Sequence, residues 1–178
     1  MSCNTHHPQR QAGAALVTSL LLLVVLTILG ITTMQMTRMQ ERMAGTTRDI
    51  SLAFQAAEAA LRDGEALIDA APTAPIPCST PPCNVYQTDF LPLLTGQGTA
   101  WWNANGIEYG VTGTDELADT LGVAQDPRRT VEYLRFVPDD LMVGGATTGR
   151  DFYQVTGYSR GASNNAYIVL QTTFAKSF

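Results

Sequence analysis

The chain has 178 residues, of which 45% are hydrophobic and 15% are charged. This length fits one domain, or one domain with an appendage; the apolar content argues against disorder, and the low charge suggests that some apolar surface contacts something other than water. Acidic residues outnumber basic ones by 16 to 11, and no run of Lys or Arg occurs, so binding driven by nucleic-acid phosphates is disfavoured, although a few local contacts to DNA stay open.

The only histidines are His6 and His7, near the start of the chain. Imidazole is the commonest general base and metal ligand in proteins, so its absence from the rest of the chain argues against most enzymes. We therefore expect no catalytic residues, no metal and no cofactor.

The N-terminal region contains an uncharged segment, residues 11–37, in which residues 14–34 are nearly all apolar. A helix of about 21 residues covers roughly 30 Å, the thickness of the hydrocarbon core of a bilayer. A secretory signal peptide usually has a shorter apolar region, followed by a cleavage site between small residues. Here the pattern continues as helix into residues 39–43, so we expect a retained transmembrane helix.

The apolar segment follows a short polar stretch that ends in Gly13. This arrangement resembles the class III leader of type IV pilins and pseudopilins. The resemblance implies that a prepilin peptidase in the inner membrane cuts between Gly13 and Ala14 and methylates the new N-terminus. A single-pass anchor with an uncut tail is the alternative interpretation.

Two further strings follow the apolar segment, ERMAG at residues 41–45 and AFQAAEAALR at residues 53–62. In combination they resemble the N-terminal region of PilX-type minor pilins over residues 9–65. A weaker similarity returns in residues 152–158 and 169–172. The resemblance implies assembly with other minor and major pilins through the N-terminal helix, and often with a large tip adhesin. The middle of the chain carries no such resemblance.

The helix is predicted to run from Ala14 to about Asp69, where Pro72 and Pro75 end it. Its second half carries a stripe of residues at helical spacing for a sheet to cover: Ile50, Phe54, Ala57, Leu61 and Ile68. Alanines in the same region permit close approach of another backbone. About 56 residues of helix span roughly 84 Å, far more than a bilayer, so half of the helix lies outside the membrane.

The predicted organisation therefore has four parts. They are a leader at residues 1–13, a transmembrane and filament-core helix at 14–37, its amphipathic continuation at 38–71, and a surface domain at 72–178.

Thr18 is the position at which the resemblance fails. Most type IV pilins carry Glu as the fifth residue after the cut, where it is thought to pair with the N-terminal amine of the subunit already in the filament. A charge in hydrocarbon is unfavourable unless it is paired, so Thr18 removes both that penalty and a docking interaction. A subunit with nothing above it does not need the pair, which places this chain at or near a filament tip as a hypothesis.

Cys78 and Cys83 lie in a proline-rich stretch, and the third cysteine, Cys3, lies in the predicted leader. Cleavage would leave two cysteines, which in an oxidising periplasm pair as a disulfide. Zinc would need about four ligands, and the mature chain lacks them. The spacing, with two prolines between the cysteines, also does not suit a thioredoxin-like redox motif.

The remaining sequence predicts an α+β fold, with a roughly four-stranded antiparallel sheet laid on the second half of the long helix. The strands are expected at 107–111, 130–137, 152–159 and 167–174, and a short helix at 115–121. Clustered Asp and Glu side chains could bind calcium, but without EF-hand spacing a solvated acidic face is the favoured interpretation.

From these features we expect a structural protein: a minor pilin that helps to initiate and assemble a type IV pilus near its tip and supports adhesion and twitching motility. It would insert in the inner membrane with its C-terminal domain in the periplasm, and then join the extracellular pilus. One alternative is a minor pseudopilin of a type II secretion system. Another is a membrane-anchored periplasmic binding or enzymatic domain.

Overall fold

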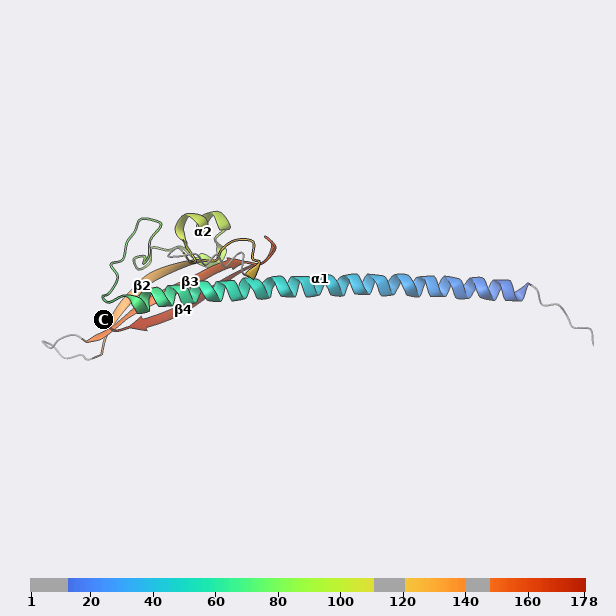
Figure 1. Ribbon diagram of the computed structural model, residues 1–178, viewed down its shortest axis with the longest axis horizontal. Coiled ribbons are helices and arrows are strands. Elements are labelled where there is room, and N and C mark those ends of the chain that lie inside the picture. The colour runs from blue at the N-terminus through green and yellow to red at the C-terminus, as the bar shows by residue number, and fades with distance from the viewer. Residues whose placement is uncertain (1–12, 111–120, 140–147) are drawn as a thin grey trace, which may run out of the picture. The chain divides into compact units, whose positions relative to one another are not determined.

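A computed structural model of the chain describes residues 13–110, 121–139 and 148–178 (Figure 1). The chain divides into two units, residues 1–45 and residues 46–178. The helix α1 (Ala14–Ala70) begins in the first unit and ends in the second. No proline interrupts it, and Pro72 follows closely after its last residue, as the sequence predicts.

In the first unit, the hydroxyl side chains of the uncharged segment are satisfied by their own helix. Each donates a hydrogen bond to a carbonyl oxygen three or four residues earlier, over distances of 2.5 to 3.2 Å: Thr18, Ser19, Thr27, Thr32, Thr33 and Thr37. These hydroxyls therefore need no water, which makes this part of α1 compatible with an apolar environment.

The second unit is built on an antiparallel sheet of four strands in the order β1-β2-β3-β4. The strands are β1 (Ile107–Glu108), β2 (Arg128–Pro138), β3 (Gly149–Arg160) and β4 (Tyr167–Lys176). The last three contain the predicted strands, whereas β1 is shorter than predicted. The α+β arrangement is thus confirmed. Most of the predicted helix at 115–121 lies outside the described residues.

Helix α1 meets this sheet with a face of small side chains. Its buried residues are Ala53, Ala56, Ala57, Ala60, Gly64 and Ile68. Gly157 of β3 lies directly below, because a Cβ atom there would stand 2.5 Å from the carbonyl oxygen of Ala57 and 3.2 Å from Leu61 Cγ. The two backbones therefore approach more closely than larger residues would allow.

The predicted stripe is wrong at Ile50 and Phe54, which are each 46% exposed. Ala57 and Ile68 are fully buried, and Leu61 is half-buried. At about 100° per residue, Phe54 falls on one flank of the buried face, whereas Ile50 has the same angle as the buried Ile68 but precedes Ala53, the first buried residue of α1. The small residues draw the helix against the sheet, so the side chain of Phe54 on the flank remains outside the contact.

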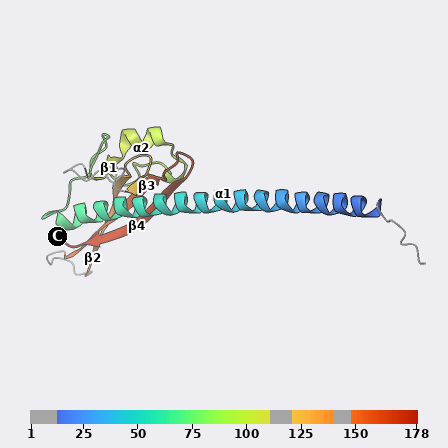
Figure 2. The same ribbon diagram turned by 45° about the vertical axis from the view of Figure 1, so that its right-hand side comes forward.

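The opposite face of the sheet is covered by the short helix α2 (Thr99–Asn105) and the 3-10 turn η1 (Leu94–Gly96). Gly157 and Tyr158 are neighbours in β3 and so face opposite sides. Tyr158 stacks on the buried ring of Trp102 at 4.9 Å between centroids. No helix is predicted here from the sequence, and Figure 2 shows α2 on the side of the sheet away from α1.

We predict that Gly157→Ala destabilises the protein by about 1–3 kcal/mol, because the added methyl group overpacks the contact with Ala57. Denaturant unfolding of the full chain in detergent, followed by near-ultraviolet circular dichroism, measures this loss. Gly96→Ala is the matched control, because a Cβ atom there meets nothing within 4 Å. Equal stabilities of the two variants would contradict the close helix–sheet contact.

Candidate functional site

The first candidate surface is the uncharged part of α1. Its large apolar side chains between residues 16 and 31 are each 44% to 67% exposed. The helix is long and apolar enough to cross a membrane. A surface of this kind is unfavourable in water and requires lipid or another apolar helix as its neighbour.

The residues assigned to processing and docking lie at the start of α1. Gly13 immediately precedes the helix, and Ala14 is its first residue. The Thr18 hydroxyl donates to the carbonyl oxygens of Ala14 and Ala15, at 3.2 and 3.0 Å. Thr18 therefore offers neither a charge nor a free donor to a neighbouring chain.

In the second unit, polar contacts fix residues 46–70 of α1 on the sheet at both ends and in the middle. Near one end, Asp49 accepts hydrogen bonds from the backbone N–H and the hydroxyl of Ser163, in the turn between β3 and β4. In the middle, Asp63 pairs with the buried Arg129 of β2. Neither contact can form unless α1 lies in this register on the sheet.

At its C-terminal end, α1 is capped from β4. Lys176 Nζ donates to the carbonyl oxygens of Ile68, Asp69 and Ala71, at 3.0, 2.5 and 2.7 Å. The last turn of α1 has no basic residue of its own. The single lysine of the sequence thus supplies the positive charge that a helix C-terminus favours.

The segment after α1 contains the predicted disulfide, between Cys78 and Cys83. The loop that the disulfide closes is held by Cys78 N–H, which donates to the carbonyl oxygen of Val85 at 2.9 Å. Residues 86–90, called the strap below, run along β2. Tyr86 N–H donates to the carbonyl oxygen of Val131 at 2.7 Å, and the Tyr86 hydroxyl donates to the carbonyl oxygen of Asn105 at 2.7 Å.

The strap ends on Glu132 of β2, whose carboxylate accepts a hydrogen bond from Phe90 N–H at 3.1 Å. Burial raises the pKa of Glu132, and hydrogen bonds from the backbone of residues 89–91 oppose that shift. The carboxylate therefore joins the strap to the sheet.

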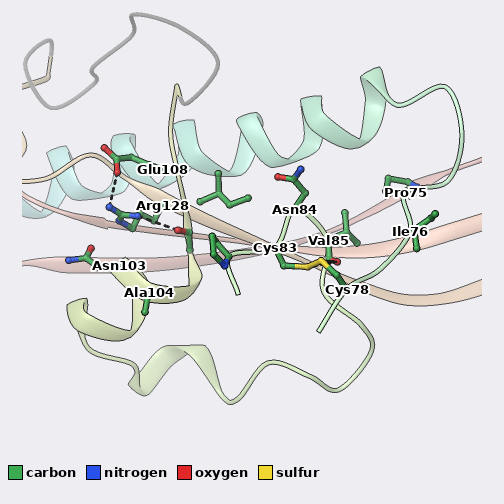
Figure 3. A pocket seen from close by; sticks show the side chains of 13 residues that line it. Pro75, Ile76, Cys78, Cys83, Asn84, Val85, Asn103, Ala104, Glu108 and Arg128 are labelled. Carbon is green, nitrogen blue, oxygen red and sulfur yellow. Dashed lines mark hydrogen bonds and ion pairs between the residues drawn. A yellow bond between two sulfur atoms is a disulfide. The ribbon is translucent and has the colours of Figure 1, made fainter. Parts of the chain in front are cut away.

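A pocket of about 870 Å³ lies between the disulfide loop, α2 and the first two strands (Figure 3). Its apolar wall includes Pro75 and Ile76, and the side chain of Ile76 is 90% exposed. On another side, Arg128 donates to Glu108 at 2.7 Å and to the carbonyl oxygen of Gly106 at 3.2 Å. The pocket has no unpaired charge of its own, and no metal-binding cluster of His, Cys, Asp or Glu occurs within the described ranges.

Two family descriptions match the chain. PilX N-terminal matches residues 12–62, and Type IV pilus assembly protein PilX C-term matches residues 54–176. The chain belongs to the PilX family of type IV pilus assembly proteins. No curated protein and no solved structure matches it.

Membership of the PilX family identifies a structural component of type IV pili, a minor pilin that associates with other pilus components. The apolar part of α1 fits the membrane anchoring and pilus association of such a protein. The second match also covers residues 70–150, where the sequence alone showed no resemblance.

The contacts that hold the helix of the PilX chain on its sheet could not be predicted from the sequence. Asp49, Asp63 and Lys176 meet partners more than sixty residues away, and no local pattern reveals such pairs. One signal was available for Lys176: a long helix with no basic residue in its last turn calls for a cation from elsewhere.

We predict that the Asp49–Ser163 contact loosens in acid. Hydrogen bonds from the Ser163 hydroxyl and N–H lower the pKa of Asp49 below its ordinary value of 3.8. Because the folded state then binds this proton more weakly than the unfolded state, the contact stabilises the folded protein at neutral pH. This contribution is lost as the pH falls through the lowered pKa of Asp49.

The chemical shift of the Ser163 amide, followed from about pH 6 to pH 2, should titrate with a midpoint below 3.8. Asp49→Asn should abolish this titration, and Ser163→Ala should move the Asp49 midpoint upward. A midpoint in the unmodified chain at or above the ordinary value would show that the contact does not stabilise the carboxylate.

Proposed function

We propose that this chain is a minor pilin that acts at or near the tip of a type IV pilus, where it helps to initiate assembly and supports adhesion and twitching motility. The observation that carries the proposal is Thr18 in a chain of the PilX family. Its hydroxyl is engaged within its own helix, and residues 14–37 contain no carboxylate for the N-terminal amine of another subunit. Such a subunit lacks the group that would dock it onto a subunit already in place, so it suits the first position, while its own N-terminal amine remains for the next subunit.

We also propose that the chain is made with a leader, residues 1–13, which prepilin peptidase removes between Gly13 and Ala14 before Ala14 is methylated. Residues 14–37 then lie in the inner membrane, residues 38–71 continue the helix, and residues 72–178 form the domain exposed first to the periplasm and then on the pilus. The Cys78–Cys83 disulfide supports an oxidising location for that domain.

The proposed partners are other minor and major pilins, packed against the apolar part of α1, and a large tip adhesin. Helix packing suits the exposed apolar side chains between residues 16 and 31, which can exchange lipid for a neighbouring helix without a change of fold. The PilX matches favour this assembly over a secretion pseudopilus and over an anchored enzyme.

We predict that the protein isolated from membranes of its host begins at N-methylated Ala14. In a strain without prepilin peptidase it should instead keep the residues before Ala14. Intact mass and N-terminal peptide analysis distinguish the two forms. A Gly13→Asp variant should remain uncut in the presence of the peptidase, whereas Gln11→Asn, a conservative change two residues earlier, should be processed. An N-terminus that is unaffected by the peptidase would remove the basis for the leader.

We predict that Thr18→Glu moves the protein from the pilus tip into the shaft, with a several-fold increase in copies per pilus. The new carboxylate would accept the N-terminal amine of a subunit already in the filament, an ion pair that is strongly favoured in an apolar environment. Immunogold labelling of an epitope-tagged chain measures its position and number. Thr18→Val is the control, because it removes the hydroxyl without adding charge. Unmodified protein found along the whole shaft would contradict the tip assignment.

A further inference from the structure

Strand β4 is the last strand in the sheet order, and among the described residues no strand pairs with its outer edge. Its ten pairs with β3 run without a register shift, from Arg160↔Tyr167 to Asp151↔Lys176. Residues 166–175 contain no charge and no proline. Edge strands usually carry a charged residue, a proline or a bulge, because a long flat edge invites pairing with another chain.

The other edge of the same sheet is covered. Beyond the short strand β1, the strap bonds to β2 at Val131, and Tyr133 N–H donates to Tyr86 at 2.9 Å. The Thr88 hydroxyl donates to the carbonyl oxygen of Tyr133 at 2.7 Å. Next to this point a bulge separates Tyr133 from Arg135 in the pairing with β3. One edge is thus protected in several ways, whereas the β4 edge has none of these devices among the residues described.

The register shows which backbone groups of β4 point outward. Gly161 N–H donates to the carbonyl oxygen of Ala166 at 3.0 Å, and this pair continues the β3–β4 ladder. In an antiparallel ladder the bonded pairs alternate. The N–H and C=O groups directed away from β3 therefore belong to Tyr167, Val169, Gln171, Thr173 and Ala175.

Two exposed apolar residues of α1, Ile50 and Phe54, form an apolar strip on the flank of the helix nearest to β4. Asp63 faces β2 through its pair with Arg129, whereas Leu61, on the opposite flank of α1, lies over Gly157 of β3. Phe54 and Ile50 precede Leu61 by about two and three helical turns, and so share its flank. Because β2 and β4 lie on opposite sides of β3, this flank faces the side on which β4 lies.

We propose that the β4 edge receives an extended strand from a different polypeptide, with apolar side chains at alternate positions. The added strand pairs with the outward backbone groups of β4, and every second side chain covers Ile50 and Phe54, each 46% exposed. Its other side chains lie beside Gln171 and Thr173 on the polar face.

A second copy of this chain fits the site poorly. Antiparallel pairing of two β4 strands would reverse residues 46–70 of α1 in one copy, whereas two chains anchored in one membrane share one direction. In parallel pairing the two sheets would present opposite faces to the same side. The polar Gln171 and Thr173 of each copy would then lie beside the apolar strip of the other. The partner is therefore another chain, and the proposal does not depend on leader cleavage or on position in a pilus.

The test uses the full chain in membranes of its host, with a photoreactive benzoylphenylalanine in place of Gln171 or of Thr173. We expect a covalent adduct with one other protein from each position. Moving the probe by two residues should move the attachment point in the partner by two residues, because both chains belong to one ladder. Attachment points without this register, no adduct, or an adduct only between copies of this chain would overturn the proposal.

The apolar strip is tested by Phe54→Asp in the chain that carries the probe at Thr173. We expect the adduct yield to fall at least fivefold. Leu93→Asp is the matched control, because Leu93 is also exposed, at 79%, but lies outside the strip. An intact Cys78–Cys83 disulfide and unchanged near-ultraviolet circular dichroism verify the fold of each variant. Equal yields from the two variants would contradict the role of the strip.

Discussion

The close contact between α1 and β3 is the constraint on which the second unit depends. Ala57 stands so near to Gly157 that no side chain fits between them, and Gly64 lies in the same way against Val155. Buried alanine and glycine contribute little apolar area themselves, so the contact is stabilised by Ile68 of α1, which packs with Val131 and Val155 of the sheet, and by the polar groups around it. Asp49, Asp63 and Lys176 hold the helix at its two ends and in its middle, and their geometry is possible only at this short distance.

The same constraint decides where the large apolar residues of α1 go. The face of small residues leaves Phe54 on the flank of the helix, and Ile50 lies before the first buried residue, Ala53. In residues 14–37 the large side chains are all exposed, and the hydroxyls between them are satisfied internally. One helix therefore carries two surfaces: a thin one that binds its own sheet, and a broad apolar one that needs a neighbour outside the chain.

Much of this structure could be predicted from local patterns. The proline-free run before Pro72 gave the helix, and alternating β-branched and aromatic residues gave β2, β3 and β4. The cysteine count predicted the disulfide. Ile50 and Phe54 were assigned to the core because hydrophobic periodicity assumes that the largest residues face inward, and α2 was missed because its short sequence has weak helix propensity. The long-range polar contacts have no local signal, except that the last turn of α1 lacks a basic residue of its own.

The apolar surface of residues 14–37 and the surface of the second unit differ in how well they distinguish one protein partner from another. Apolar helix packing of the kind offered by residues 14–37 is tolerant, because neighbouring leucine and valine side chains are nearly interchangeable in lipid or in a filament core. A minor pilin must nevertheless be distinguished from the major one. Directional groups can make that distinction, and the second unit offers them at the open backbone edge of β4 and around the pocket beside the disulfide loop. Hydrogen bonds along a strand fix register as well as affinity, so an edge can specify one partner where a helix alone cannot.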